Sequence, residues 1–484
     1  MSLGDYKESH PVAQFKNQKN NLFVALITFV ATLGGLLFGY DTAVISGAEQ
    51  SLEHYLIHPL ELNSIIHGLT VSSALIGCMI GGAISGFFSN RMGRRNSLRL
   101  AAVLFIISAL GSAVPEFLFF EKGEPSIALL IMFNVYRIVG GIGVGLASAI
   151  SPTYIGEIAP PQIRGKLVSW YQFAVIFGML VVYFVNWSIA SGQSIEWIRD
   201  IGWRYMFASE AIPAFLFLVL LFFVPETPRY LARKNKNNEA LRLLEKLSGS
   251  KETAQSILFE INASFNTTRT SGSLFSYGKL VIVVGILLSV FQQFVGINVA
   301  LYYAPRIFES MGAGQHASMV QTVVMGAVNV IFTIIAIKRV DRWGRKPLLM
   351  VGSAGMAVGM FGVAGLAFFD MIGPGILAFI ILYTASFMMS WGPVCWVLLS
   401  EIFPNKIRGQ AIGIAVAAQW VANFFISSTY PSMMEVSEGF TYAFYGGMSL
   451  LSALFVWKLV PETKGKSLEE LEALWTPKKK KISA

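Results

Sequence analysis

Long apolar runs separated by short polar breaks dominate the chain from residue 22 onward. Twelve runs lie between charged residues or Gly/Pro breaks, at 22–46, 64–88, 97–117, 127–152, 165–188, 203–224, 279–302, 317–338, 347–369, 374–399, 410–430 and 440–460. A helix that crosses a bilayer takes about 20 apolar residues. The pattern therefore predicts an all-α membrane protein with twelve transmembrane helices, and it excludes a β-barrel, whose short strands alternate in polarity.

One long polar stretch, 225–278, interrupts the series between the sixth and seventh runs. Its charged residues recur at helical spacing, which predicts short amphipathic helices on the membrane surface. We expect five segments: an N-terminal segment 1–21, a six-helix half 22–224, a helical insert 225–278, a second six-helix half 279–460 and a tail 461–484.

The composition agrees with a membrane protein. Hydrophobic residues make up 54% of the 484 positions and charged residues only 13%, too few to cover a soluble fold of this size. The net charge of +9 comes from basic clusters beside the predicted spans, such as RMGRR at 91–95, so it reports topology and not nucleic-acid binding. These clusters, the insert and both termini fall on one side, which predicts that both termini are cytoplasmic.

Reactive side chains are scarce. The two cysteines, Cys78 and Cys395, lie inside apolar runs and are expected to be small core residues. There are five histidines and no metal-binding spacing such as CxxC or HExxH. We therefore expect no metal, no cofactor and no enzymatic activity.

Short motifs of the first half recur in the same order in the second. RMGRR (91–95) recurs as RWGRK (342–346), EIAPPQIRG (157–165) as EIFPNKIRG (401–409), and PETP (225–228) as PETK (461–464). This repetition predicts two six-helix halves related by an axis along the membrane normal. With these motifs the chain resembles the sugar porter family of the major facilitator superfamily.

The resemblance has consequences for function. The stretches LGGLLFGYDTAVISG (33–47), FQQFVGIN (291–298), SWGPVCWVLLSEIFP (390–404) and PETKGKSLEELEALW (461–475) are similar to the xylose–proton symporters of this family. This resemblance implies that the protein is a monomer of the bacterial inner membrane. It also implies that the protein imports a pentose, most of all D-xylose, together with a proton. Passive or proton-coupled transport of glucose, galactose or arabinose remains an alternative, and a non-transporting sugar receptor is a remote one.

Three ionisable side chains lie well inside apolar runs, away from the run ends: Asp41, Arg137 and Glu210. A charge inside a bilayer costs at least ~3 kcal/mol, and such residues usually mark ion or proton pathways. The depths of Asp41 and Arg137 are compatible with an ion pair, which is either structural or part of a proton pathway. The resemblance places Asp41 where the xylose symporters hold their proton-coupling acid, while a capping role for Glu210 remains open.

Amides and aromatic rings inside the spans suit a sugar, because amides both donate and accept hydrogen bonds and rings stack on C–H faces. The resemblance implies that the sugar contacts Gln172, Gln292, Gln293, Asn298, Trp396 and Gln419, and that Phe38, Tyr302 and Trp420 line the pocket. On a regular helix Gln292 and Asn298 would not share a face, so we expect the helix to unwind at Gly296. We expect the first helix to be broken likewise, at Gly34, Gly35 and Gly39.

Charged pairs recur at equivalent positions in the two halves. Glu157 and Arg164 of the first half correspond to Glu401 and Arg408 of the second. Pairs between the halves are expected to form a cytoplasmic gate that opens and closes in each cycle, since exposed ion pairs contribute only about 0–1 kcal/mol each. The alternative is that these residues are ordinary charges at helix ends.

Overall fold

The computed structural model describes residues 18–117, 120–121, 124–160, 163–266, 274–275, 277–310, 312–369, 371, 373–404, 407–466, 470–471 and 475. All regular secondary structure within these residues is helical. Twelve segments are long and apolar enough to cross a membrane. The prediction of an all-α, multi-pass membrane protein with twelve spans is therefore confirmed.

The first six spans are built from eight α-helices with short irregular joints. They are α1 (Gln18–Leu52), α2 (Ser64–Met92), α3 (Arg94–Ala113), α4 (Ile127–Ile158), α5 (Arg164–Ala190), α6 (Ile195–Trp197), α7 (Trp203–Ser209) and α8 (Ala211–Leu220). The joints η1 (Glu53–Ile57) and η2 (His58–Leu60) follow α1, and η3 (Ile198–Gly202) leads into α7.

The remaining helices form the insert and the last six spans. The insert holds α9 (Pro228–Arg233), α10 (Asn237–Ser248) and α11 (Lys251–Asn266). The spans hold α12 (Lys279–Phe294), α13 (Ile297–Tyr302), α15 (Gln315–Trp343), α16 (Arg345–Phe368), α17 (Pro374–Met389), α18 (Trp391–Ile402), α19 (Arg408–Val436) and α20 (Glu438–Leu459), with α14 (Ala304–Ser310) beside them.

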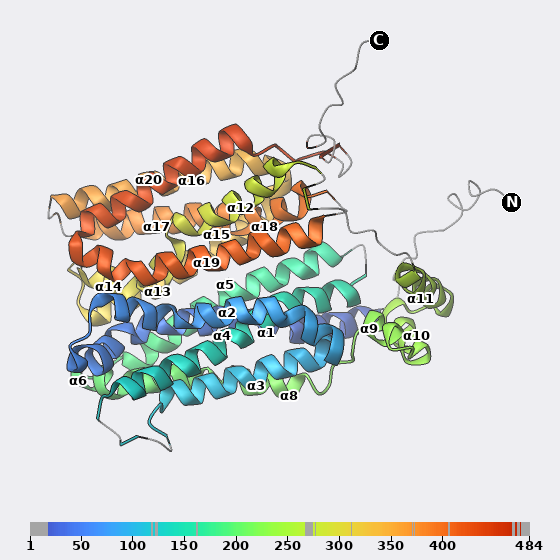
Figure 1. Ribbon diagram of the computed structural model, residues 1–484, viewed down its shortest axis with the longest axis horizontal. Coiled ribbons are helices and arrows are strands. Elements are labelled where there is room, and N and C mark those ends of the chain that lie inside the picture. Colours follow the sequence, from blue (N-terminus) through green and yellow to red (C-terminus); the bar gives the residue numbers. More distant parts are fainter. Residues whose placement is uncertain are drawn as a thin grey trace, which may run out of the picture.

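The spans form two bundles that lie side by side, the first half in blue to green and the second in yellow to red (Figure 1). The first half packs α2 and α3 against α4 and α1 against α5, and the second packs α16 against α20 and α12 against α19. The halves meet where α2 contacts α19 and α5 contacts α15. We call the end that carries α9–α11 the insert end, and the end that carries α6 and α14 the far end (Figure 1).

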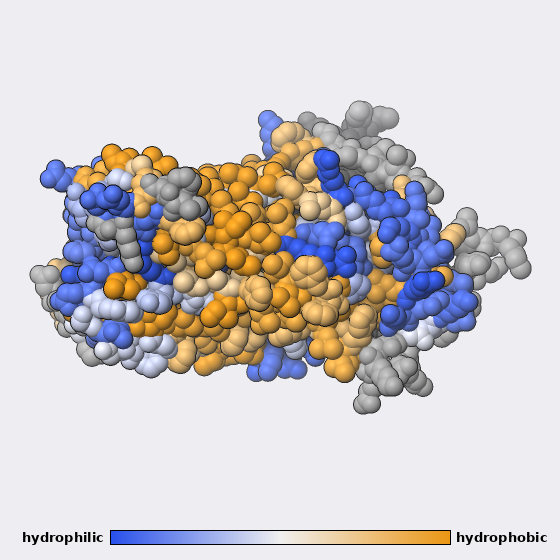
Figure 2. Space-filling model, turned by 90° about the horizontal axis from the view of Figure 1, so that it is seen from below, coloured by the Kyte–Doolittle hydropathy of each residue, from blue (hydrophilic) through white to orange (hydrophobic). Residues whose placement is uncertain are grey.

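On the face seen in Figure 2, a belt of apolar side chains lies between two polar ends. Many large hydrophobic residues of the chain are strongly exposed, for example Phe223 at 79%, Ile212 at 74% and Phe215 at 61%. Side chains of this size are stable on a surface only when the surrounding medium is apolar. The belt is therefore the part of the surface that fits the hydrocarbon core of a bilayer.

Local sequence signals set where the spans begin. At the far end Asn63, Ser126 and Ser437 cap α2, α4 and α20, and each side chain accepts a backbone N–H of the first turn. At the insert end Gly93 and Gly344 turn the chain between α2 and α3 and between α15 and α16. Their φ angles of 91° and 88° are positive, a region that favours glycine.

The seventh span is broken at Gly296, as predicted. Gly296 has a φ of 90° and separates α12 from α13. The Tyr383 hydroxyl donates a 2.7 Å hydrogen bond to the carbonyl of Val295, so a backbone acceptor at the break is satisfied. The ring of Tyr445 packs against Gly296 and leaves no room for a side chain there. The break is therefore a fixed bend.

The prediction of a second break, in the first helix, is wrong. α1 runs without interruption through Gly34, Gly35 and Gly39. A Cβ atom on Gly39 would lie only 1.9 Å from the Val175 carbonyl oxygen of α5, and one on Gly35 would meet Tyr171. These glycines serve close packing of α1 against α5, a role that small residues often have between membrane helices.

Candidate functional site

Gln292 lies at the centre of a chain of hydrogen-bonded amides. Its Nε2 donates to the carbonyl oxygen of Trp391 at 3.1 Å, and its Oε1 accepts from the side chains of Gln293 and Gln419. The Oε1 atom of Gln293 accepts in turn from the Asn298 amide. The bend at Gly296 makes this last contact possible. Four of the six predicted sugar-binding residues are thus joined in one network.

Two tryptophans of α18 lie in different environments. Trp391 is fully buried, and its Nε1 donates to the Ser353 hydroxyl at 2.8 Å. Trp396, the predicted stacking residue, is 41% exposed. Sequence reasoning missed Trp391, although Gly392 and Pro393 directly after it signal the helix break at Ser390 that turns its carbonyl toward Gln292.

The other predicted pocket residues come from both halves. The rings of Phe38 on α1 and Trp420 on α19 are 6.0 Å apart between centroids, so this contact joins the halves. Tyr302 is buried at the end of α13. Gln172 lies half-buried on α5, and its side chain makes no hydrogen bond with any other described residue.

Asp41 and Arg137 form the predicted ion pair between α1 and α4. The Arg137 Nη1 atom lies 2.8 Å from Oδ1 of Asp41, and its Nη2 donates to the backbone oxygen of Asp41 at 3.0 Å. Both side chains are buried, at 0% and 1% exposure. The guanidinium also lies over the ring of Phe207, 5.3 Å from its centre.

Glu210 joins this pair at the irregular joint between α7 and α8. It is fully buried, and neither of its carboxylate oxygens has a hydrogen-bond partner among the described residues. The Oδ2 atom of Asp41 is likewise without a partner. Asp41 and Arg137 are the charged groups that act on Glu210. Two buried carboxylates therefore lie near one buried guanidinium that bonds to only one of them, which is an arrangement that can hold or release a proton.

The two predicted gate glutamates pair with other arginines of their own halves. Glu157 contacts the Arg94 guanidinium at 2.7 Å, and Glu401 contacts that of Arg345 at 3.0 Å. Arg164 is exposed, and the Nε of Arg408 donates to the carbonyl oxygen of Phe403.

Two equivalent glutamates, one in each half, bind backbone N–H groups at the insert end. Glu226 accepts the backbone N–H groups of Arg94 and Arg95, and Glu462 accepts those of Arg345 and Lys346. Burial raises the pKa of Glu226. Burial also acts to raise the pKa of Glu462, but the backbone donors outweigh it and hold this pKa below its usual value.

Glycines of α2 and α19 have different surroundings at the two ends of the molecule. At the far end a Cβ atom on Gly68 of α2 would lie 1.9 Å from the Ser428 carbonyl oxygen of α19. Toward the insert end, Gly82 and Gly86 of α2 and Gly409 and Gly413 of α19 face open space. The side chains of Asn298 and Gln419 are half-buried and that of Trp396 is exposed, so each keeps part of its surface accessible.

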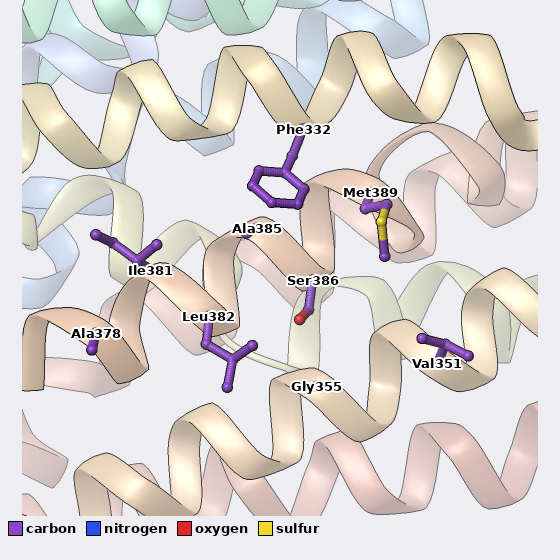
Figure 3. A pocket seen from close by; sticks show the side chains of 9 residues that line it. All are labelled: Phe332, Val351, Gly355, Ala378, Ile381, Leu382, Ala385, Ser386 and Met389. Atoms are coloured by element: carbon purple, nitrogen blue, oxygen red, sulfur yellow. The ribbon is translucent and has the colours of Figure 1, made fainter. Parts of the chain in front are cut away.

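A separate hollow of about 490 Å³ lies between α15, α16 and α17. Its lining is almost entirely apolar, with Phe332, Val351, Ile381, Leu382 and Met389 around it (Figure 3). A sugar needs donors and acceptors that replace its water shell. This hollow therefore does not fit a sugar, and the amide network is the better candidate.

Two six-helix halves, the first with a buried ion pair and the second with a network of amides, define a membrane transporter of the two-half type. The family model "Sugar (and other) transporter" matches residues 27–475. The chain belongs to this family.

Known proteins resemble the chain over almost its whole length. It is 54% identical to the D-xylose-proton symporter of Escherichia coli (strain K12), over 96% of this chain and 98% of that protein. It is 40% identical to the glucose facilitated diffusion protein of Zymomonas mobilis subsp. mobilis, over 94% and 98%. The inward-open structure of the E. coli xylose transporter superposes with a TM-score of 0.85, at 52% identity over 93% of this chain and 100% of that one.

Proposed function

We propose that the protein imports D-xylose together with a proton by alternating access. The observation that carries the proposal is the buried Asp41–Arg137 pair beside the unpartnered Glu210. A passive sugar carrier has no need for buried acids, and their cost inside a membrane favours a role in proton transfer. The similarity to a D-xylose-proton symporter supports both the substrate and the coupling.

Sugar recognition rests on the amide network. Gln292, Gln293, Asn298 and Gln419 bond to one another, and the Oε1 atom of Gln419 is left without a partner among the described residues. A sugar hydroxyl that enters can donate to this oxygen and can exchange the bonds between the amides for bonds to itself. Gln172 would contact the sugar from the first half, Trp396 would stack on it, and Phe38, Tyr302 and Trp420 would limit its size.

Proton coupling follows from the charge balance of the buried trio. When Asp41 takes a proton it loses most of its attraction for Arg137, and the guanidinium then turns to Glu210, whose oxygens are free. When the proton leaves, the Asp41–Arg137 pair reforms. Because the Arg137 guanidinium changes partner in this way, Asp41 can take up a proton on one side of the membrane and release it on the other.

We infer that the insert end is cytoplasmic and that the far end faces outward. The basic clusters at 91–95, 162–166, 338–346 and 405–409 adjoin the insert end, as the positive-inside rule requires. The structure then corresponds to the inward-facing state. In the outward-facing state, Glu157, Arg164, Glu401 and Arg408 would form the inner gate between the halves.

Labelling of engineered cysteines tests this orientation. Ser256→Cys on α11 and Gln193→Cys at the far end both place a thiol at an exposed position, while the native Cys78 and Cys395 are buried. In intact cells a membrane-impermeant maleimide should label Cys at 193 and leave Cys at 256 unlabelled until the cells are opened. The reverse pattern would overturn the orientation.

Uptake of labelled sugars into proteoliposomes tests the function itself. With an inward proton gradient, xylose should accumulate inside above its external concentration, and dissipating the gradient should return it to equilibrium. Equilibration without accumulation would instead establish a passive carrier. Parallel assays with glucose, galactose and arabinose would establish the preferred sugar.

Trp396→Ala should abolish measurable xylose binding. The ring is 41% exposed, so its loss removes a stacking surface at little cost to packing. Isothermal titration calorimetry on purified protein measures the effect, and Trp457→Ala, at another exposed tryptophan (59%), is the matched control. An unchanged affinity in Trp396→Ala would remove this residue from the site.

A further inference from the structure

A charged cluster at the far end joins the two halves and takes no part in the sugar or proton steps. Arg306 on α14 comes from the second half, and Glu49, Glu53 and His67 come from the first. The Nη1 atom of Arg306 lies 3.2 Å from Glu49 Oε2, 2.9 Å from Glu53 Oε2 and 3.4 Å from His67 Nδ1.

The cluster is shielded from water to a degree that surface ion pairs are not. The side chains of Glu49 and His67 are 0% exposed, that of Glu53 is 19% exposed and that of Arg306 is 29% exposed. Shielding strengthens the attraction between opposite charges. The two carboxylates therefore bind the guanidinium more firmly than an exposed pair would.

The three residues of the first half also have the chemistry of metal ligands, with ligand atoms within 4.8 Å of one another. The Arg306 guanidinium already lies among these atoms and supplies the positive charge. A divalent cation would be repelled by it. The arrangement is therefore better explained as a contact between the halves than as a metal site.

Other contacts at the far end hold the same two halves together. The Ser64 and Ser432 hydroxyls are 3.2 Å apart, and the Tyr183 hydroxyl donates to the carbonyl oxygen of Leu301 at 2.9 Å. These bonds are neutral, whereas the Arg306 cluster carries opposite charges that attract over a longer range.

We propose that Arg306 is the outer latch of the transporter: it closes the far end by pairing with Glu49 and Glu53, and the pairs part when that end opens. The proposal rests on the proposed function only in that the halves rock against each other. Opening does not leave Glu49 without a partner, because His67 Nε2 in the same half lies 3.2 Å from its Oε2. That second partner makes the latch reversible.

A single engineered thiol can report on the latch. Ser46 is 3% exposed and lies with Tyr183, Pro305 and Met319, which come from both halves, around a hollow of about 10 Å³. Ser46→Cys changes one atom and places the thiol where it becomes accessible from the far end only when the halves part there. Cys78 and Cys395 are fully buried, so the maleimide should react little with these native cysteines.

In this reporter, Arg306→Gln should speed labelling by a membrane-impermeant maleimide about tenfold, a size typical of coupling between two states. Glu124→Gln, at an exposed charged residue of the same end, should leave the labelling rate unchanged. Arg306→Lys retains the positive charge beside both carboxylates and should return the rate toward that of the parent.

Labelling of Arg306→Gln at the parent rate would overturn the latch, and so would labelling of Arg306→Lys as fast as that of Arg306→Gln. If Arg306→Gln does not fold, as judged by size-exclusion chromatography, Glu53→Gln decides in its place: faster labelling than the parent supports the latch and the parent rate overturns it. The assay needs neither sugar nor a proton gradient. A failure of xylose transport would therefore appear in the uptake assay and not here.

Discussion

Asp41→Asn should abolish xylose accumulation driven by a pH gradient, while sugar binding and sugar exchange persist. Asparagine has the shape of the protonated acid but cannot carry the proton. An inward gradient of one pH unit is equivalent to about 1.4 kcal/mol, so coupling to one proton allows roughly tenfold accumulation. The variant should reach a ratio of about 1 under the same gradient.

The variant is expected to fold because Arg137 keeps partners. The backbone oxygen of residue 41 still accepts its Nη2, and the oxygens of Glu210 are free to pair with it. Proton uptake by lightly buffered cells gives a second readout: xylose should alkalinise the medium with the wild type and not with Asp41→Asn. Asp200→Asn, at an exposed acid of the far end, is the matched control.

Two results would contradict this mechanism in different ways. Continued accumulation by Asp41→Asn would place the coupling elsewhere, with Glu210 the next residue to test by Glu210→Gln. A wild type that moves no protons would make the protein a passive carrier, as the facilitated diffusion protein of Zymomonas mobilis is named to be.

Gln292→Ala should weaken xylose binding more than a change at any other single amide. Gln292 bonds to Trp391, Gln293 and Gln419 at once, so its loss removes a sugar contact and also leaves neighbouring amides unpaired. We expect a loss of about 2–3 kcal/mol, or a Kd raised roughly 30- to 150-fold. Gln293→Ala should act in the same direction but less strongly, because it lies one step from the centre.

Calorimetry on the purified variants measures these affinities. Gln193→Ala, at an exposed glutamine in a turn of the far end, controls for the loss of an amide as such. Size-exclusion chromatography separates lost binding from lost folding. An affinity within about twofold of the wild type would mean that the network is structural and that the sugar binds elsewhere.

The sequence predicted best what depends on neighbouring residues. Hydropathy alone located the twelve spans, and the special backbone of glycine identified the bend at Gly296. The same argument failed at Gly39, because a glycine that bends a helix and one that admits a neighbouring helix look alike in sequence. Only the docking of α1 on α5 distinguishes them.

Contacts between the halves were the least predictable. Asp41 and Arg137 were recognised as partners because a buried charge demands one. Arg306 lies between two predicted spans, where a charged side chain can be solvated and does not indicate a partner. Its partners are some 250 residues away in the chain. Trp391 contributes its backbone carbonyl, and residue type alone does not reveal such a role.

The glycines that face open space have a practical use in the design of a biosensor. A Cβ atom on Gly82 of α2 or on Gly413 of α19 would meet no atom of another segment within 4 Å, so a cysteine-linked dye fits at either position. Closure of the inner side would bring the two dyes together and quench them. Because Cys78 and Cys395 are buried, such labels would be site-specific. A protein labelled in this way would give an optical signal for each passage through the cycle, in real time and without a radioactive sugar.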